Sequence, residues 1–63
     1  MSAEVEREIL ELCEYFSCCA PDFIIYELKR KGHDPVLSTQ VLEGLIQRKK
    51  LGQKENGPLY LNK

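Results

Sequence analysis

Apolar residues recur with a helical period in the second half of the chain, and a short basic run follows them. Their spacing places them on one face of an α-helix, and the five positions are Leu37, Val41, Leu42, Leu45 and Ile46. The basic run Arg48–Lys50 comes next, where positive charge offsets the negative end of the helix dipole. The pattern predicts a helix over residues 37–50.

Two short runs that follow this helix are separated by turn-forming residues. The runs lie around Leu51–Lys54 and Leu59–Asn62, and Asn56-Gly57 stands between them. Asparagine and glycine tolerate the positive φ that a tight hairpin turn requires. We therefore expect residues 51–62 to form a two-stranded hairpin.

Two shorter helical patterns precede these elements. The first covers Ala3–Phe16, with apolar residues at Val5, Ile9, Leu12, Cys13 and Phe16. Pro21 disfavours helix in the residue before it and suits the first turn of a new helix. A second helix is therefore expected at about Asp22–Lys31, and Gly32 is expected to end it. The stretch between the two helices has the local sequence of a loop.

The order helix, helix, helix, hairpin resembles the winged helix-turn-helix family, most of whose members bind duplex DNA. The resemblance rests on element order, spacing and the Asn56-Gly57 turn, and it covers nearly the whole chain. It implies an α+β fold in one domain, residues 1–63, with three helices followed by a two-stranded C-terminal wing. It also implies that the stretch near residues 17–20 forms a short first strand that pairs with the hairpin.

The resemblance assigns the third helix to the DNA. In the family this helix lies in the major groove, and its N-terminal, solvent-facing residues meet base edges. Glutamine can make two hydrogen bonds to adenine, and serine and threonine can bond bases or phosphates. Glu43 lies in the same stretch and would repel phosphate. The candidates for base contact on this chain are Ser38, Thr39, Gln40 and Gln47.

Charge is unevenly divided along the chain, although the formal net charge is −1. Residues 1–28 hold seven acidic residues and one arginine, whereas residues 29–63 hold eight basic and three acidic residues. This division predicts an acidic end and a basic end, and a basic surface attracts phosphates whatever the net charge. The same basic clusters also suit the C-terminal ends of two helices. The candidates for phosphate contact are Arg30, Lys31, Arg48, Lys49, Lys50 and Lys54.

The length and the motifs narrow the class of protein. A chain of 63 residues forms one small domain, without room for a catalytic cleft beside a substrate-binding domain. The sequence has no glycine-rich phosphate loop and no nucleophile placed near a base, so we expect no enzyme, no cofactor and no small-molecule substrate. No apolar run approaches the ~20 residues of a membrane span, and the acidic N-terminus is unlike a signal peptide. We expect a cytoplasmic protein, or a nuclear one in a eukaryote.

Three cysteines and one histidine are the remaining candidates for chemistry. Cys18 and Cys19 are adjacent and the number of cysteines is odd, so we expect no disulfide framework. Cys13 lies on the apolar face of the first helix and should pack in the core. The cysteine spacing matches none of the usual zinc pairs, so no metal is expected. Cys18 and Cys19 are candidate redox-sensitive thiols. If they form a strand, their side chains point to opposite faces, so one of them would be exposed. His33 precedes the third helix and is expected to be solvated.

Two functions stay open on this reading of the sequence. The first is a small DNA-binding protein, a transcriptional regulator with residues 37–50 in the major groove and the 51–62 wing on the backbone. The alternative is a protein-interaction module of the same fold, part of a larger complex and without nucleic-acid binding. An exposed apolar patch around Phe23, Tyr26 and Tyr60 would then make the contact. Duplex DNA is the expected partner. The first helix could also mediate a homodimer or bind a protein partner. A thiol-sensor variant would use Cys18 or Cys19 to change the affinity for DNA.

Overall fold

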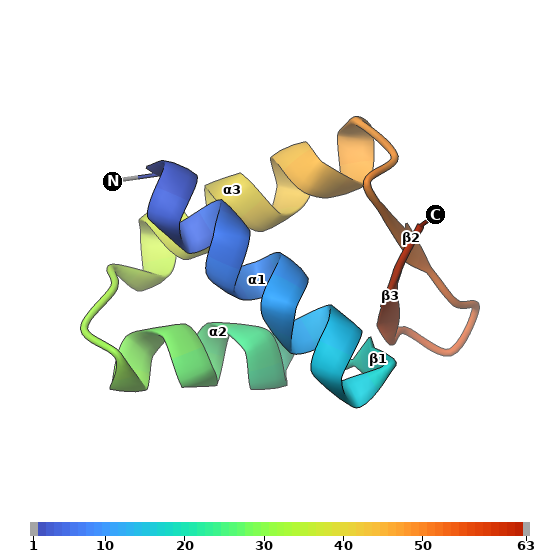
Figure 1. Cartoon of the computed structure of the whole chain (residues 1–63), viewed down its shortest axis with the longest axis horizontal. Coiled ribbons are helices and arrows are strands. Elements are labelled where there is room, and N and C mark those ends of the chain that lie inside the picture. The colour runs from blue at the N-terminus through green and yellow to red at the C-terminus, as the bar shows by residue number, and fades with distance from the viewer. Residues whose placement is uncertain (1, 63) are drawn as a thin grey trace.

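The computed structural model describes residues 2–62 as three helices and a small antiparallel sheet (Figure 1). The α+β class expected from the sequence is therefore confirmed. The sheet lies at one end of the molecule, and α1 crosses between α2 and α3 in this view. No helix in the described part of the chain is long and apolar enough to cross a bilayer. The elements are α1 (Ser2–Phe16), β1 (Cys18–Cys19), α2 (Pro21–Arg30), α3 (Pro35–Gln47), β2 (Leu51–Gln53) and β3 (Leu59–Leu61).

The sheet joins the segment after α1 to the C-terminal hairpin. Its strand order is β1-β3-β2, and both pairs are antiparallel. Cys18 lies opposite Tyr60, and Tyr60 lies opposite Gly52 on its other side. The short strand expected near residues 17–20 is thus present at Cys18–Cys19. Since two residues are too few to show an alternating pattern, pairing with β3 is what makes them a strand.

The core is built from every helix and from the sheet. Its buried side chains are aliphatic residues and two cysteines, namely Val5, Ile9, Cys13, Cys19, Ile24, Leu28, Leu42, Leu45, Leu51 and Leu59. The helical period of the sequence predicted most of them. Phe16 is an exception, because it is 48% exposed. It is the last residue of α1, and the chain turns away through Ser17 at a φ of 68°, so the ring follows the helix end and leaves the core.

The third helix begins earlier and ends earlier than the expected 37–50. Asp34 caps its start, since the Asp34 carboxylate accepts a hydrogen bond of 3.0 Å from the Leu37 backbone N–H. Pro35 occupies the first turn, where its missing N–H costs nothing. The second helix likewise starts at Pro21, one residue before the expected Asp22. In both cases the proline belongs to the helix that follows it.

Helices α2 and α3 end in the same hydrogen-bonded turn. The His33 N–H donates to the Leu28 carbonyl in one helix, and the Lys50 N–H donates to the Leu45 carbonyl in the other, both at 3.0 Å. This turn needs one residue in the left-handed conformation, which is Gly32 at a φ of 93° in α2. In α3 the same position holds Lys49 at a φ of 63°. Arg48–Lys50 therefore form the turn that ends α3, and they do not extend the helix as expected.

The hairpin loop is one residue longer than the gap between the two expected runs. It spans Lys54–Pro58, closed by a 2.8 Å hydrogen bond from the Lys54 N–H to the Pro58 carbonyl. Gly57 has a φ of 111°, whereas Asn56 is not among the residues with positive φ. Each strand is one residue shorter than the expected run, because Lys54 belongs to the loop and β3 ends at Leu61.

Candidate nucleic-acid interface

One face of α3 is turned to solvent over the whole length of the helix. Its exposed side chains are Val36, Thr39, Gln40, Glu43 and Gln47, which recur at helical spacing. The Thr39 hydroxyl donates a hydrogen bond of 2.9 Å to the Pro35 carbonyl, and its oxygen lone pairs stay available as acceptors. Three of the four base-contact candidates, Thr39, Gln40 and Gln47, are therefore accessible.

Ser38 is not part of this face, and its assignment as a base-contact candidate is wrong. Its side chain is fully buried. Ser38 lies four residues before Leu42 and seven before Leu45, so all three share the buried side of α3. This spacing was visible in the sequence, but the polar residue type concealed it. The Ser38 hydroxyl has no hydrogen-bond partner among the described residues.

Replacing Ser38 with alanine should therefore stabilise the domain. A buried hydroxyl without a partner costs about 1–3 kcal/mol, and the Ser38→Ala change removes it and leaves the backbone bonds of α3 intact. We expect the free energy of unfolding to rise by about 1 kcal/mol, measured by urea titration with circular dichroism. Thr39→Ala is the matched control, since it removes an exposed hydroxyl that is bonded. A loss of stability in Ser38→Ala would contradict the unpartnered state of the hydroxyl.

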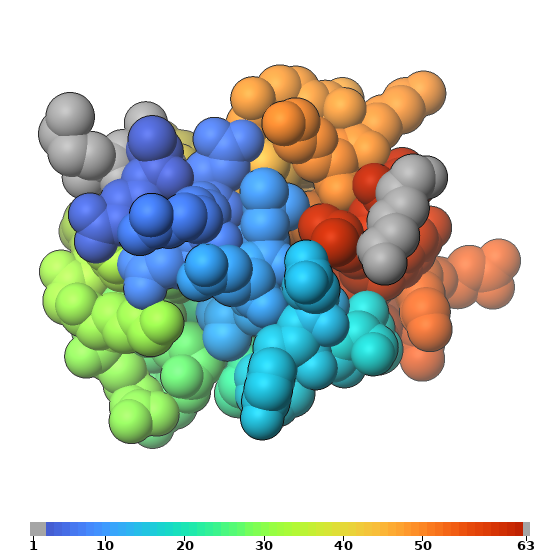
Figure 2. All heavy atoms as spheres, in the orientation of Figure 1, coloured from blue at the N-terminus to red at the C-terminus, as the bar shows by residue number. Residues whose placement is uncertain are grey.

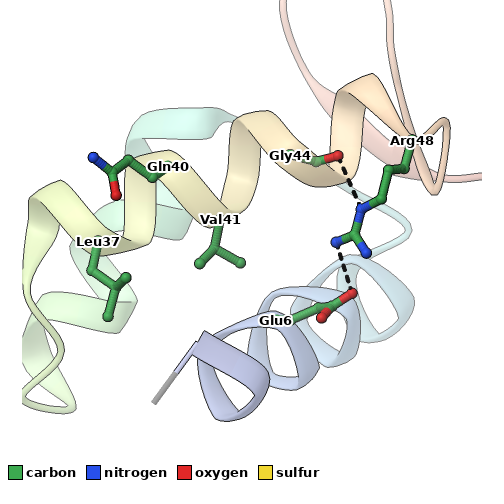
Figure 3. A pocket seen from close by; sticks show the side chains of 6 residues that line it. All are labelled: Glu6, Leu37, Gln40, Val41, Gly44 and Arg48. Atoms are coloured by element: carbon green, nitrogen blue, oxygen red, sulfur yellow. Dashed lines mark hydrogen bonds and ion pairs between the residues drawn. The ribbon is translucent and has the colours of Figure 1, made fainter.

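Three of the six phosphate-contact candidates are paired with carboxylates. Arg48 contacts Glu6 of α1 at 3.0 Å and also donates to the Gly44 carbonyl at 3.3 Å (Figure 3). Lys31 contacts Glu8 of α1 at 3.0 Å, and Arg30 contacts Glu27 at 3.1 Å. The acidic first half of the sequence thus lies against basic residues of the second half. Part of the expected acidic end and part of the expected basic end are therefore in contact, because α1 packs across both other helices.

The other three candidates make no ion pair within residues 2–62. They are Lys49 and Lys50 at the end of α3 and Lys54 at the start of the hairpin loop. The end of α3 and the hairpin loop project from the same end of the molecule (Figure 2). The C-terminal end of α2, which carries Arg30 and Lys31, lies at the opposite end (Figure 1). The unpaired cations therefore flank the C-terminal part of α3.

An open groove of about 430 Å³ separates α1 from α3 beside this face. Leu37 and Val41 supply its apolar lining, and the Glu6–Arg48 ion pair spans one end (Figure 3). Gly44 leaves part of the space empty, because a Cβ added there would meet nothing within 4 Å. Gln40 lies at the rim and is shared with the exposed face of α3. The groove is too open to bury a small ligand.

A compact polar cluster ties α1 to the turn between α2 and α3. The Glu8 carboxylate contacts both the Lys31 ammonium and the His33 ring, and the His33 side chain is only 15% exposed. The expectation of a solvated His33 is therefore wrong. Ligand atoms of Glu4, Glu8 and His33 lie within 4.8 Å of one another, which could suit a divalent cation. We assign no metal here, because Lys31 and His33 already occupy both oxygens of Glu8.

The Glu8 pairing should make stability depend on pH. The hydrogen bond from Lys31 holds the pKa of Glu8 below its ordinary value of 4.5, so the ionised form stabilises the folded state. This contribution to stability is complete above the pKa that Glu8 has in the unfolded chain. It disappears as the pH falls through the lower pKa that Glu8 has in the folded state. Glu8→Gln is expected to lower the free energy of unfolding at pH 7 by up to about 1 kcal/mol. Urea titrations at pH 7 and pH 3 would measure this, and the difference from wild type should shrink at pH 3.

The control for this prediction is Glu11→Gln. Glu11 is exposed on the same helix and has no ion pair among the described residues, so its replacement should change little at either pH. If Glu8→Gln lowered the free energy of unfolding as much at pH 3 as at pH 7, the cause would be lost packing and not lost charge.

The three thiols differ in accessibility. Cys13 is buried, as expected, and burial raises the pKa of its thiol to about 11. Cys19 is also buried, burial raises its pKa, and its thiol donates to the Leu12 carbonyl at 3.6 Å. Oxidation needs an accessible thiolate, so Cys19 is withdrawn as a redox-sensitive candidate. Cys18 is exposed on β1 and stays a candidate. The two neighbours thus face opposite sides of the strand, as a strand requires.

Similarity to known proteins adds nothing to this geometry. No family model, no curated protein and no solved structure matches the chain. The exposed face of α3, the unpaired lysines beside it and the order of the elements are therefore the observations from which a function can be argued.

Proposed function

We propose that this protein binds duplex DNA with α3 in the major groove and acts as a small transcriptional regulator. The observation that carries the proposal is the solvent-exposed face of α3, on which Thr39 and Gln40 lie in one turn and Gln47 lies two turns further on. An α-helix fits the major groove, and glutamine can bond adenine through two hydrogen bonds. Glu43 stands on the same face, where it would repel phosphate and accept a bond from the cytosine amino group.

The architecture supports this proposal. Three helices with a strand after the first, and a C-terminal hairpin that pairs with that strand, are what the resemblance to winged helix-turn-helix proteins implies. The hairpin would then be the wing and would lie along the DNA backbone. Such a role requires that the protein work in the cytoplasm, or in the nucleus of a eukaryotic cell.

Phosphate contact is assigned first to Lys49, Lys50 and Lys54, which have no carboxylate partner among residues 2–62. Arg48 would have to leave Glu6 before it could reach a phosphate, and Arg30 and Lys31 would have to leave Glu27 and Glu8. Each neutralised phosphate adds about −0.9 to the slope of log K against log salt concentration. Three contacts predict a slope of about −3.

Fluorescence anisotropy of a labelled generic duplex, repeated at several salt concentrations, tests the proposal. Wild type should bind at low salt with a slope of about −3. Lys49→Gln/Lys50→Gln should weaken binding and reduce the slope by about 2. Arg7→Gln/Lys29→Gln removes the same charge from exposed positions on α1 and α2 and should leave the slope unchanged. Glu43→Gln should strengthen binding to the generic duplex, because it removes a charge that repels phosphate.

Two results would contradict the proposal. The first is no binding at low salt. The second is an equal loss of DNA affinity in both charge variants. DNA would then be attracted to any exposed cation, and the end of α3 would have no particular role.

A further inference from the structure

Four of the five aromatic residues lie on the surface, in one region formed by the end of α1 and the start of α2. Tyr15 is 80% exposed and Tyr26 is 60% exposed, and Phe16 and Phe23 are partly covered by each other. We call Tyr15, Phe16, Phe23 and Tyr26 the aromatic row. Contiguous exposed apolar side chains of this kind mark interaction sites, whereas isolated ones do not.

Three members of the row contact one another. Tyr15 and Phe16 meet edge to face with ring centroids 4.8 Å apart, and Phe16 and Phe23 do so at 5.4 Å. Tyr26 follows Phe23 by one helical turn, so it extends the row along α2. The buried core is aliphatic and does not include these rings. Folding therefore does not account for their placement.

The row differs from the patch expected around Phe23, Tyr26 and Tyr60. Tyr60 lies on β3 and its ring covers Gly52 in the neighbouring strand, so it belongs to the sheet. The aromatic row contains Tyr15 and Phe16 where the expected patch had Tyr60, because α1 ends beside the start of α2.

Negative charge surrounds the row. Glu11 precedes Tyr15 by one turn, Glu14 is next to Tyr15, and Asp22 is next to Phe23. All three carboxylates are exposed, and none makes an ion pair within the described residues. On α2 beyond Tyr26, Lys29 is exposed and makes no ion pair among the described residues, whereas Arg30 is paired with Glu27. The surface therefore combines aromatic faces with more unpaired carboxylates than unpaired cations.

We propose that the aromatic row is a docking site for an apolar segment of a partner protein that carries arginine. A guanidinium group stacks on aromatic rings and bonds carboxylates through two parallel hydrogen bonds, so arginine satisfies both features of the surface. A second copy of this chain fits poorly, because a twofold contact would bring three carboxylates against the same three. The exposed face of α3 is directed away from α1 and α2, which leaves it available to DNA while the partner is bound.

Selection from a random 12-residue peptide library against the full chain tests this inference. Peptides are counter-selected on the Phe16→Ser/Phe23→Ser variant, whose folding is checked by circular dichroism. We expect the enriched peptides to contain arginine beside leucine or an aromatic residue. Their affinity should fall about tenfold or more in Phe16→Ser/Phe23→Ser, as for central aromatic contacts. It should also fall several-fold in Glu14→Gln/Asp22→Asn, which keeps every ring. Val36→Ser, an exposed apolar site on α3, is the matched control and should retain binding.

Three results would overturn the inference. Peptides that bind the Phe16→Ser/Phe23→Ser variant equally well would remove the row from the contact. Enriched peptides without cations would remove the role of the carboxylates. Sedimentation equilibrium that showed a dimer lost in the same variant would assign the row to a second copy. DNA binding by the variants is measured in parallel, so a failure of the DNA proposal would leave this test intact.

Discussion

Leu45→Ala should remove a large share of the stability of the protein. Leu45 is fully buried on α3, where it packs among the aliphatic side chains of the core. Truncation of such a leucine costs about 2–5 kcal/mol, from lost burial and from the cavity that is left. A domain of 63 residues has a total stability of only about 3–9 kcal/mol. Urea titration followed by circular dichroism would measure the loss.

Val36→Ala is the control for this result. Val36 is an apolar residue of the same helix but is 65% exposed, so its truncation should change the stability by no more than about 0.5 kcal/mol. A similar loss in both variants would contradict the assignment of the core side of α3. It would also weaken the assignment of the opposite side to DNA, because the two sides are defined by the same helical rotation.

Gly52→Ala should destabilise the sheet, and its effect should depend on Tyr60. A Cβ at Gly52 would lie 2.7 Å from Cε2 of the Tyr60 ring, which is closer than van der Waals contact allows. The ring would have to move off the strand, at a cost of about 1–3 kcal/mol. In a Tyr60→Ala background the methyl group meets no ring, so Gly52→Ala should cost little.

The four proteins of this cycle, compared by urea titration, would give a coupling energy of about 1–3 kcal/mol. Gly44→Ala is the matched glycine control. A Cβ at Gly44 meets nothing within 4 Å, and alanine favours helix over glycine, so this variant should gain up to about 1 kcal/mol. An equal cost of Gly52→Ala with and without the Tyr60 ring would show that the backbone, and not the ring, demands glycine.

The helices were predictable because their apolar residues follow one period over several turns. Leu42 and Leu45 are examples, and both are buried as that period requires. The strand Cys18–Cys19 carries no such signal, since two residues cannot show alternation, and the resemblance to a known fold supplied it. The predicted starts of α2 and α3 are one and two residues late, because each predicted range leaves out the proline that opens the helix.

The candidate site was less predictable than the fold. The helical rotation of Ser38 placed it with Leu42 and Leu45, but its polar side chain suggested the opposite side. The partners of Arg48 and Lys31 are 42 and 23 residues away along the chain, so only the crossing of α1 over the other helices reveals them. The pairing of His33 with Glu8 escaped prediction for the same reason.

The left-handed Lys49 puts stability and charge in competition at a single position. Glycine there, as in the matching turn of α2, would relieve about 1–2 kcal/mol of steric strain, a large share of what holds so small a domain together. It would also delete one of the three phosphate-contact candidates that have no carboxylate partner in the described chain. If those lysines hold DNA, the strain is a cost of function. Replacing Lys49 with glycine to raise the thermal stability of the protein would then lower its affinity for DNA.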